Sequence, residues 1–312
     1  MRTALVTFGY GRPDHFKRML TGLGSALGFI DCDIDIHHYL DGGHGSQQNE
    51  IVEVIEVSGV PYTKIVRRPE NFGVGRQLIG ARREIFDEQG YDRMILMEDD
   101  VEPGPSFLTA LLRLSDWAHT FSDVGTVQAW NVHEGGEEDL KDDLDKVVLT
   151  NRHFVTYCLT KSVWDAIKPA LYEYEERFLL DRPYAKRANY RIRFFMRHWM
   201  KKARQVREGK RLDPPEQAVS NPFPRVKFRH TPSSQDSVTS MAIHQAGFVR
   251  LALQVPRAYY FGETGVHITP DLFREMNFHL QGHHVWSPDS EPEAFTMRYK
   301  DDEGNWLHSF YR

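Results

Sequence analysis

The sequence predicts an α/β protein with a mixed, mainly parallel sheet flanked by helices. Two observations lead to this prediction. Short apolar runs bounded by glycine, proline or charged residues alternate with segments whose apolar residues recur at helical spacing. The chain has 312 residues, 40% of them hydrophobic, which is enough to bury the core of one large α/β domain or two small ones.

The N-terminal part shows the alternation most clearly. "TALVTF" at 3–8 is predicted to be a buried strand, and a helix should follow, because Pro13 suits a first helical turn and Gly28 can end the helix. Apolar residues on one face of this helix are Phe16, Met19, Leu20, Leu23 and Leu27. The next predicted elements are strands at 33–40, 63–68 and 92–97, and a helix over 74–88.

Three adjacent carboxylates, Glu98, Asp99 and Asp100, follow the apolar strand "DRMILM". In parallel α/β sheets ligands bind beyond the carboxyl ends of the strands, where these acids are predicted to lie. Adjacent carboxylates repel one another, and oxygen ligands suit a hard divalent cation such as Mg²⁺ or Mn²⁺. The alternative is an acidic turn that caps the next helix, and the motif alone does not decide between the two.

The second half of the chain is less regular. A strand is predicted at 123–131, a polar acidic loop at 133–145, and a strand leading into a helix over 156–171. Residues 182–211 contain 12 Lys or Arg against one acid, Glu208, and 213–232 is rich in proline. A helix at 235–247, a strand at 248–253 and a glycine-punctuated loop at 260–267 complete the prediction.

Composition narrows the functional class. The formal net charge of −5 excludes the chain as a whole from nucleic-acid binders on charge grounds. Cys32 and Cys158 are predicted to be buried thiols of a reducing compartment, not a disulfide. No apolar run is long enough for a signal peptide or a membrane span, so we expect a cytoplasmic protein. "FGYGRPD" lacks the third glycine of a dinucleotide-binding fingerprint.

Several motifs, in the same order along the chain, resemble one family. "ILMEDDVEPGPSF" resembles the metal motif of glycosyltransferases with the GT-A fold. "YLDGGHGS", "VQAWNVHEGG" and "YCLTKSVWDAI" resemble the nucleotide-binding turn, the strand after the metal motif and the acceptor-side helix of the N-acetylglucosaminyltransferase I family. "QAGFVRLALQVPRAYYFGETGVHITPDLF" resembles its C-terminal strand and the loop that closes over the donor.

This resemblance implies a metal-dependent, inverting transfer of a sugar from a nucleotide-diphosphate donor, such as a UDP-sugar. It implies one GT-A domain over 1–312, with a nucleotide- and metal-binding half at 1–131 and an acceptor half at 132–312. Asp100 would contact Mn²⁺ or Mg²⁺, and Glu98 and Asp99 would line the nucleotide side. It also implies that Asp41 would hydrogen-bond the nucleotide base and that Arg12 would lie near the nucleotide. The chain departs from the family in its insertion at about 182–232, which displaces the family's acid-rich catalytic segment.

The catalytic base is therefore chosen among the remaining carboxylates. Inverting transfer needs one base that takes a proton from the acceptor hydroxyl. Asp236, before the predicted C-terminal helix, is the first candidate, and its alternative role is the N-cap of that helix. Asp181 in "FLLDRPY" is the second candidate.

Two further side chains are candidate ligands. His267 in "GVHIT" could reach the metal or the diphosphate, although a lone histidine is more often structural. Arg76, at a predicted helix start, could bind the donor phosphates or be a solvated surface residue.

The partner of the basic segment 182–211 stays open at this stage. It could contact anionic lipid or a glycan or lipid-linked acceptor, or it could be a solvated helical insertion with a buried aromatic face. The resemblance implies a hexosyl- or N-acetylhexosaminyltransferase. The rival hypotheses are a sugar-nucleotide hydrolase and a non-catalytic sugar- or nucleotide-binding protein on the same scaffold.

Overall fold

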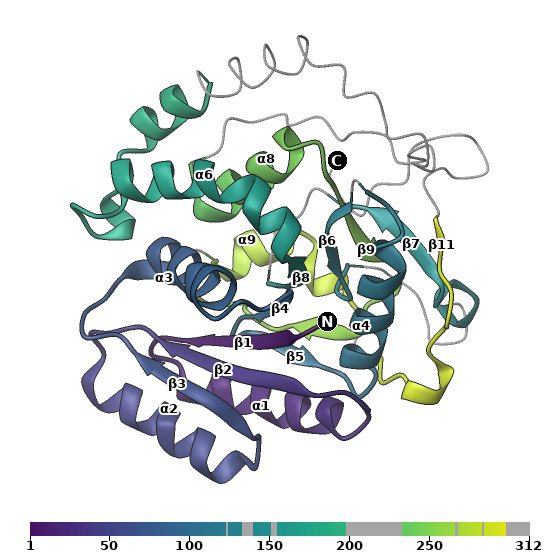
Figure 1. The fold of residues 1–312 in the computed structure, drawn as a ribbon. Helices are drawn as coiled ribbons and strands as arrows, with labels where there is room; N and C mark the ends of the chain where they lie inside the picture. The colour runs from purple at the N-terminus through teal and green to yellow at the C-terminus, as the bar shows by residue number, and fades with distance from the viewer. Residues whose placement is uncertain are drawn as a thin grey trace.

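A mixed sheet with helices on both faces forms the centre of the protein. The computed structural model describes residues 1–122, 124–132, 140–150, 155–197, 233–265, 268–282 and 284–297. Within these residues, nine strands form one sheet in the order β11-β7-β9-β6-β8-β4-β1-β2-β3 (Figure 1). The predicted α/β architecture with a largely parallel sheet is confirmed.

The parallel part of the sheet comes from the N-terminal half. It comprises β1 (Thr3–Gly9), β2 (Ile34–Leu40), β3 (Tyr62–Arg67) and β4 (Arg93–Met97). Every residue of β1 and β4 is buried, as expected for strands covered on both faces. Thr7 pairs with His38 and with Met97, so the carboxyl ends of β1, β2 and β4 meet at one edge.

The other half of the sheet is mixed. Strand β8 (Thr156–Thr160) is antiparallel to β4 and to β6 (Val124–Gln128), and β6 is parallel to β9 (Val249–Leu253). Beyond β9 lie β7 (Lys146–Leu149) and β11 (Thr296–Met297). A separate antiparallel pair joins β5 (Val101–Pro103) to β10 (Ala258–Tyr260).

Two hydrophobic clusters cover the two faces of the sheet. One cluster contains residues of α1 (Pro13–Leu27), α2 (Gly45–Ser58) and α4 (Phe107–Ala118). The other contains residues of α3 (Gly73–Arg83), α6 (Lys161–Phe178) and α8 (Gln235–Gln245), together with Ile192 and Met196. Figure 1 shows α1 and α2 on one side of the strands and α3, α6 and α8 on the other. The short helix α9 (Pro270–Glu275) adds Phe273 to the first cluster.

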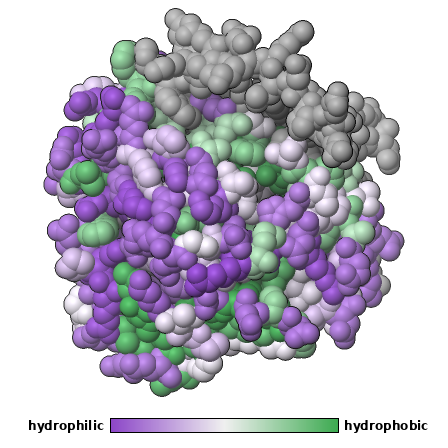
Figure 2. Space-filling view, viewed as in Figure 1, coloured by the Kyte–Doolittle hydropathy of each residue, from purple (hydrophilic) through white to green (hydrophobic). Residues whose placement is uncertain are grey.

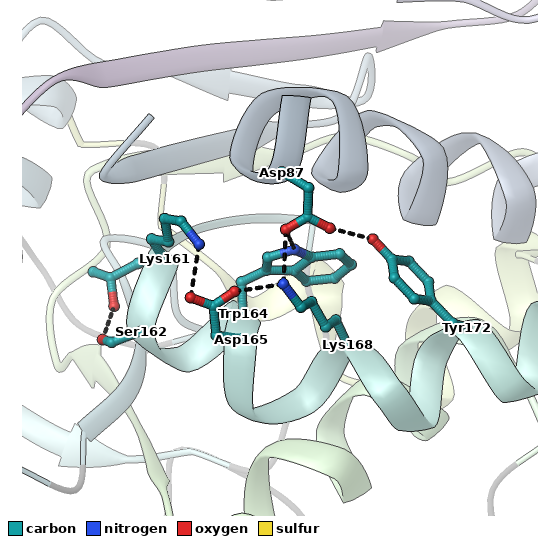
Figure 3. A network of polar contacts seen from close by, with 8 residues as sticks. Asp87, Lys161, Ser162, Trp164, Asp165, Lys168 and Tyr172 are labelled. Carbon is teal, nitrogen blue, oxygen red and sulfur yellow. Dashed lines mark hydrogen bonds and ion pairs between the residues drawn. The ribbon is translucent and has the colours of Figure 1, made fainter. Parts of the chain in front are cut away.

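A polar network fixes α6 against the end of the α3 segment. The predicted helix over 74–88 is α3 followed by η1 (Glu84–Glu88), a turn of π-helix that carries Asp87. Three side chains of α6 donate to the Asp87 carboxylate: Trp164 Nε1 at 3.1 Å, Lys168 Nζ at 2.9 Å and the Tyr172 hydroxyl (Figure 3). These bonds join two elements that are about 80 residues apart in sequence.

Some predictions differ from the structure. Cys158 is buried, as predicted, and both cysteines are free thiols. The prediction of a buried Cys32 is wrong, because its segment 31–33 lies exposed at the surface before β2. Helix α2 and strands β5, β7, β10 and β11 were not predicted, because they are short or weakly periodic. His267, residues 133–139 of the acidic loop and residues 198–232 lie outside the described part. None of the described helices is both long and apolar enough to span a membrane.

Candidate active site

The three acids lie where the sequence places them, at the carboxyl end of β4. The Glu98 backbone N–H donates to the Val155 carbonyl at 3.0 Å, which continues the pairing of β4 with the β8 segment. Asp99 and Asp100 are 5% and 7% exposed, so the protein has taken two carboxylates almost completely out of water. Burial of unpaired charge is costly, and the acids therefore need a counter-charge.

Arg12 supplies one such counter-charge. It is the N-cap residue of α1, directly beyond the end of β1. Its Nη2 contacts Asp99 and lies 3.0 Å from Asp100 Oδ2, and its Nε donates to Asp99 Oδ2 at 3.2 Å. The two carboxylates outweigh the effect of burial and raise the pKa of Arg12. One guanidinium nevertheless faces three carboxyl groups, so Arg12 cannot neutralise all of them in their ionised forms.

The pKa values of the acids reflect this shortage of positive charge. Burial, reinforced by Asp100, Asp236 and Asp99, raises the pKa of Glu98 well above its usual range. Burial, opposed by Arg12, raises the pKa of Asp99 to about 6. Deprotonating these groups would become easier if a cation entered the site.

Asp236 reaches the same site from α8. It lies in the first turn of this helix, and Ser234, not Asp236, is the N-cap: its hydroxyl accepts the Ser237 N–H at 3.2 Å. The alternative role of Asp236 as N-cap is therefore wrong. Its Oδ1 is buried without a hydrogen-bond partner among the described residues, and burial raises its pKa to about 6. Asp236 is close enough to raise the pKa of Glu98, although 138 positions separate the two in sequence.

A buried polar cluster that the sequence did not predict lies beside Asp236. Arg82 of α3 is 1% exposed, and its Nε donates to the Tyr157 hydroxyl at 3.1 Å. Its Nη1 has no partner among the described residues. Arg250 of β9 is also buried, and burial lowers its pKa to about 9 against the attraction of Tyr157 and Asp236. One signal was available in the sequence: Arg82 follows Leu78 by four residues on the apolar face of the predicted helix.

The segment after β10 packs directly against the acids. The Phe261 N–H donates to the Asp100 carbonyl at 2.9 Å, and the Tyr260 hydroxyl donates to the Gly262 carbonyl at 3.3 Å. A Cβ on Gly262 would lie 2.8 Å from Asp100 Oδ2 and 2.5 Å from the Tyr260 hydroxyl. Only glycine fits this close approach without a shift of the loop or of the site.

Asp41 lies at the carboxyl end of β2 and is 5% exposed. Its carboxylate accepts the backbone N–H groups of Gly42, Phe72 and Gly73 at 3.0, 2.7 and 2.9 Å. Through these bonds it joins the turn after β2 to the start of α3. Its role toward a nucleotide base stays a prediction.

The two other predicted residues, Arg76 and Asp181, do not contact the acids within the described part of the chain. Arg76 is in the first turns of α3, 3.6 Å from Glu70 and 4.1 Å from the centre of the Phe72 ring. It lines a hollow of about 510 Å³ between α3 and α6. Asp181 is exposed after α6, and no contact within the described residues joins it to the acids.

The residues present fit a divalent cation at Asp100. Its Oδ1 is buried and has no hydrogen-bond partner within the described ranges, and such an oxygen is stabilised by a cation. No group of three or more possible ligands surrounds one point among the described residues. A cation bound here would thus depend on substrate oxygens as well as on Asp100, which is how Mg²⁺ commonly binds with phosphates.

Three solved structures are weakly similar to this chain. A mannosyltransferase from Pyrobaculum calidifontis in complex with GDP-Man and Mn²⁺ superposes with a TM-score of 0.38 at 12% identity, over 53% of this chain and 46% of that one. S. aureus TarS gives 0.45 at 11% identity, over 88% of this chain and 38% of that one. Glucosyl-3-phosphoglycerate synthase from Mycobacterium tuberculosis, in complex with Mn²⁺, UDP-Glc and phosphoglyceric acid, gives 0.34 at 12%, over 56% and 66%. The chain thus spans less than half of the first two proteins. No family model and no curated protein matches the sequence.

Proposed function

We propose that the protein is a metal-dependent glycosyltransferase that moves a sugar from a nucleotide-diphosphate donor, a UDP-sugar, to an acceptor hydroxyl with inversion. One observation carries the proposal. Glu98, Asp99 and Asp100 at the end of β4 and Asp236 at the start of α8 converge on one buried site at the edge where β1, β2 and β4 end. This edge is where parallel α/β sheets bind their ligands.

The N-terminal half would hold the donor. Asp100 would bind Mn²⁺ or Mg²⁺, with His267 as a second ligand, and the bound cation would offset the charge of the departing diphosphate. Arg12 already contacts Asp99 and Asp100 and would stay beside the diphosphate. Asp41 would hydrogen-bond the nucleotide base, and Arg76 would add positive charge for the donor phosphates at the start of α3.

Asp236 would act as the base. A base for an acceptor hydroxyl must be unprotonated and must have an oxygen free to accept the proton. Asp236 Oδ1 meets the second condition among the described residues, and a pKa of about 6 leaves the group mostly ionised at neutral pH. Asp181 stays the second candidate. The acceptor would be a glycan or a lipid-linked sugar, and the transferred group a hexose or an N-acetylhexosamine.

A donor screen tests the proposal. Nucleotides and nucleotide sugars are added with Mn²⁺, and the shift in unfolding temperature is measured, because a ligand of the native state stabilises it by mass action. We expect a UDP-sugar to stabilise the protein with Mn²⁺ and not with chelator. Asp100→Ala should abolish this shift and turnover, whereas Asp31→Ala, an exposed acid in the turn before β2, should change neither.

The same assay separates the rival functions. Full activity of Asp100→Ala in chelator would refute the metal site. Release of free sugar without an acceptor would indicate a sugar-nucleotide hydrolase. Donor binding without turnover across an acceptor panel would indicate a non-catalytic binding protein.

A further inference from the structure

The helix of residues 189–197 presents exposed aromatic side chains and arginines on one surface. Ile192 and Met196 are buried at 0% and 1% exposure, so this helix is anchored to the core through one face. Its other face exposes Tyr190 at 76% and Phe194 at 75%. Apolar side chains that gather in one exposed patch mark interaction surfaces.

Arginines surround these aromatic residues. Arg191, Arg193 and Arg197 are exposed on the same helix, and Arg177 of α6 lies 5.0 Å from the centre of the Phe195 ring. Four arginines and four aromatic residues of this region line a hollow of about 800 Å³. At the upper left of Figure 2, exposed hydrophobic atoms lie among hydrophilic ones, where Figure 1 shows this helix.

The charge of this surface is opposite to that of the whole chain. Residues 182–197 contain six Lys or Arg and no acid, in a protein of net charge −5. Within the described residues, Arg177 pairs with Glu173 at 2.7 Å, whereas neither Arg191 nor Arg193 is paired with a carboxylate. Clustered cations that lack counter-charges repel one another, and an anionic partner would relieve this repulsion.

We propose that this surface binds the face of an anionic lipid bilayer. An interfacial helix combines basic residues with aromatic residues that enter the boundary between headgroups and acyl chains, as Arg191, Arg193, Tyr190 and Phe194 would do. The anchored face of the helix and its free face lie on opposite sides, so binding requires no rearrangement of the core. The proposal does not depend on the catalytic site.

Vesicle co-sedimentation of the full chain tests this surface. The probes are vesicles of phosphatidylcholine alone and of phosphatidylcholine with phosphatidylglycerol, at ~0.01 M and ~0.15 M salt, where the screening length falls from ~30 Å to ~8 Å. We expect binding to the anionic vesicles only, weaker at the higher salt. Arg191→Gln/Arg193→Gln should weaken it about 30-fold, because each basic residue near an anionic surface is worth about a five-fold change in affinity.

Matched variants separate local charge from total charge. Lys17→Gln/Lys64→Gln removes two exposed cations elsewhere and should leave vesicle binding within about two-fold of the wild type, since charges beyond a screening length contribute little. Phe194→Ser should lower the binding that persists at the higher salt by about ten-fold, because it removes apolar burial. Unfolding temperatures of all variants should stay unchanged, because the substituted side chains are exposed.

Three results would overturn the proposal. The first is no binding to anionic vesicles at low salt. The second is an equal loss in the Lys17→Gln/Lys64→Gln variant. The third is a wild-type dimer by light scattering that Phe194→Ser converts to a monomer, which would assign the surface to a second copy of the chain.

Discussion

Asp236→Asn is expected to lower turnover while raising stability. The substitution keeps the shape of the side chain and removes its charge and its capacity to accept a proton. Removing a general base costs about 10²–10⁴-fold in kcat, which corresponds to about 3–5 kcal/mol of activation free energy. Donor affinity should stay unchanged, because the base acts on the acceptor.

The stability change follows from the pKa of Asp236. Burial raises this pKa from 3.8 to about 6 in the folded protein. A carboxyl with a raised folded pKa destabilises the fold above that pKa, because the unfolded chain releases the proton more readily. The difference corresponds to about 3 kcal/mol at pH 8, and it disappears below about pH 4. Asp236→Asn should therefore raise the free energy of unfolding at pH 8 by up to about 3 kcal/mol and leave it unchanged at pH 3.5.

Two assays and one control test this reasoning. Urea unfolding at the two pH values measures stability, and transfer from the donor found by the screen measures kcat. The wild-type rate should also fall about ten-fold for each pH unit below pH 6, because the base must be ionised. Asp181→Asn serves as the control and should keep the rate. The assignment would be refuted if Asp236→Asn kept kcat within about ten-fold of the wild type. It would also be refuted if Asp181→Asn lost turnover instead.

Three further predictions concern single side chains. His38 is buried, and burial lowers its pKa to about 3, so the unfolded chain takes up the proton first as pH falls. Urea unfolding of the wild type and of His38→Gln should therefore show that the difference between their free energies of unfolding shifts by about 2 kcal/mol in favour of the variant from pH 7 to pH 5. Gly262→Ala should weaken binding of UDP with Mn²⁺ by about 5–150-fold in calorimetry, because the added methyl group would press on Asp100. Gly265→Ala is the control and should bind normally, because a Cβ there would lie 3.6 Å from Arg12 Nη1, an ordinary contact. Asp87→Ala should lower the free energy of unfolding by about 1–3 kcal/mol, because it removes the acceptor that Trp164, Lys168 and Tyr172 share, and of these Lys168 keeps Asp165 as a partner. A loss below ~0.5 kcal/mol would contradict this.

The sequence alone determined the N-terminal half of the sheet. The runs at 3–8 and 92–97 are strands, because continuous apolar residues between turn residues are a local signal. The runs at 33–40 and 63–68 are strands as well, and in 33–40 the local signal is the alternation of apolar and polar residues. The position of the acids followed from the same signal, since they directly succeed one of these strands. Short strands such as β5 and β11 carry no such pattern and form only because a partner strand is present.

Only the tertiary structure brought the parts of the site together. Asp236 approaches Glu98 because α8 packs on the same face of the sheet as α3 and α6, and no local pattern records that packing. The capping role predicted as an alternative for Asp236 went to Ser234, two residues earlier, since the cap depends on where the helix begins. Arg82 is buried because Tyr157 offers it an acceptor from the adjacent β8. The physical reason is common to all three: periodicity fixes which face of an element is buried, whereas the pairing of buried polar groups depends on contacts between distant segments.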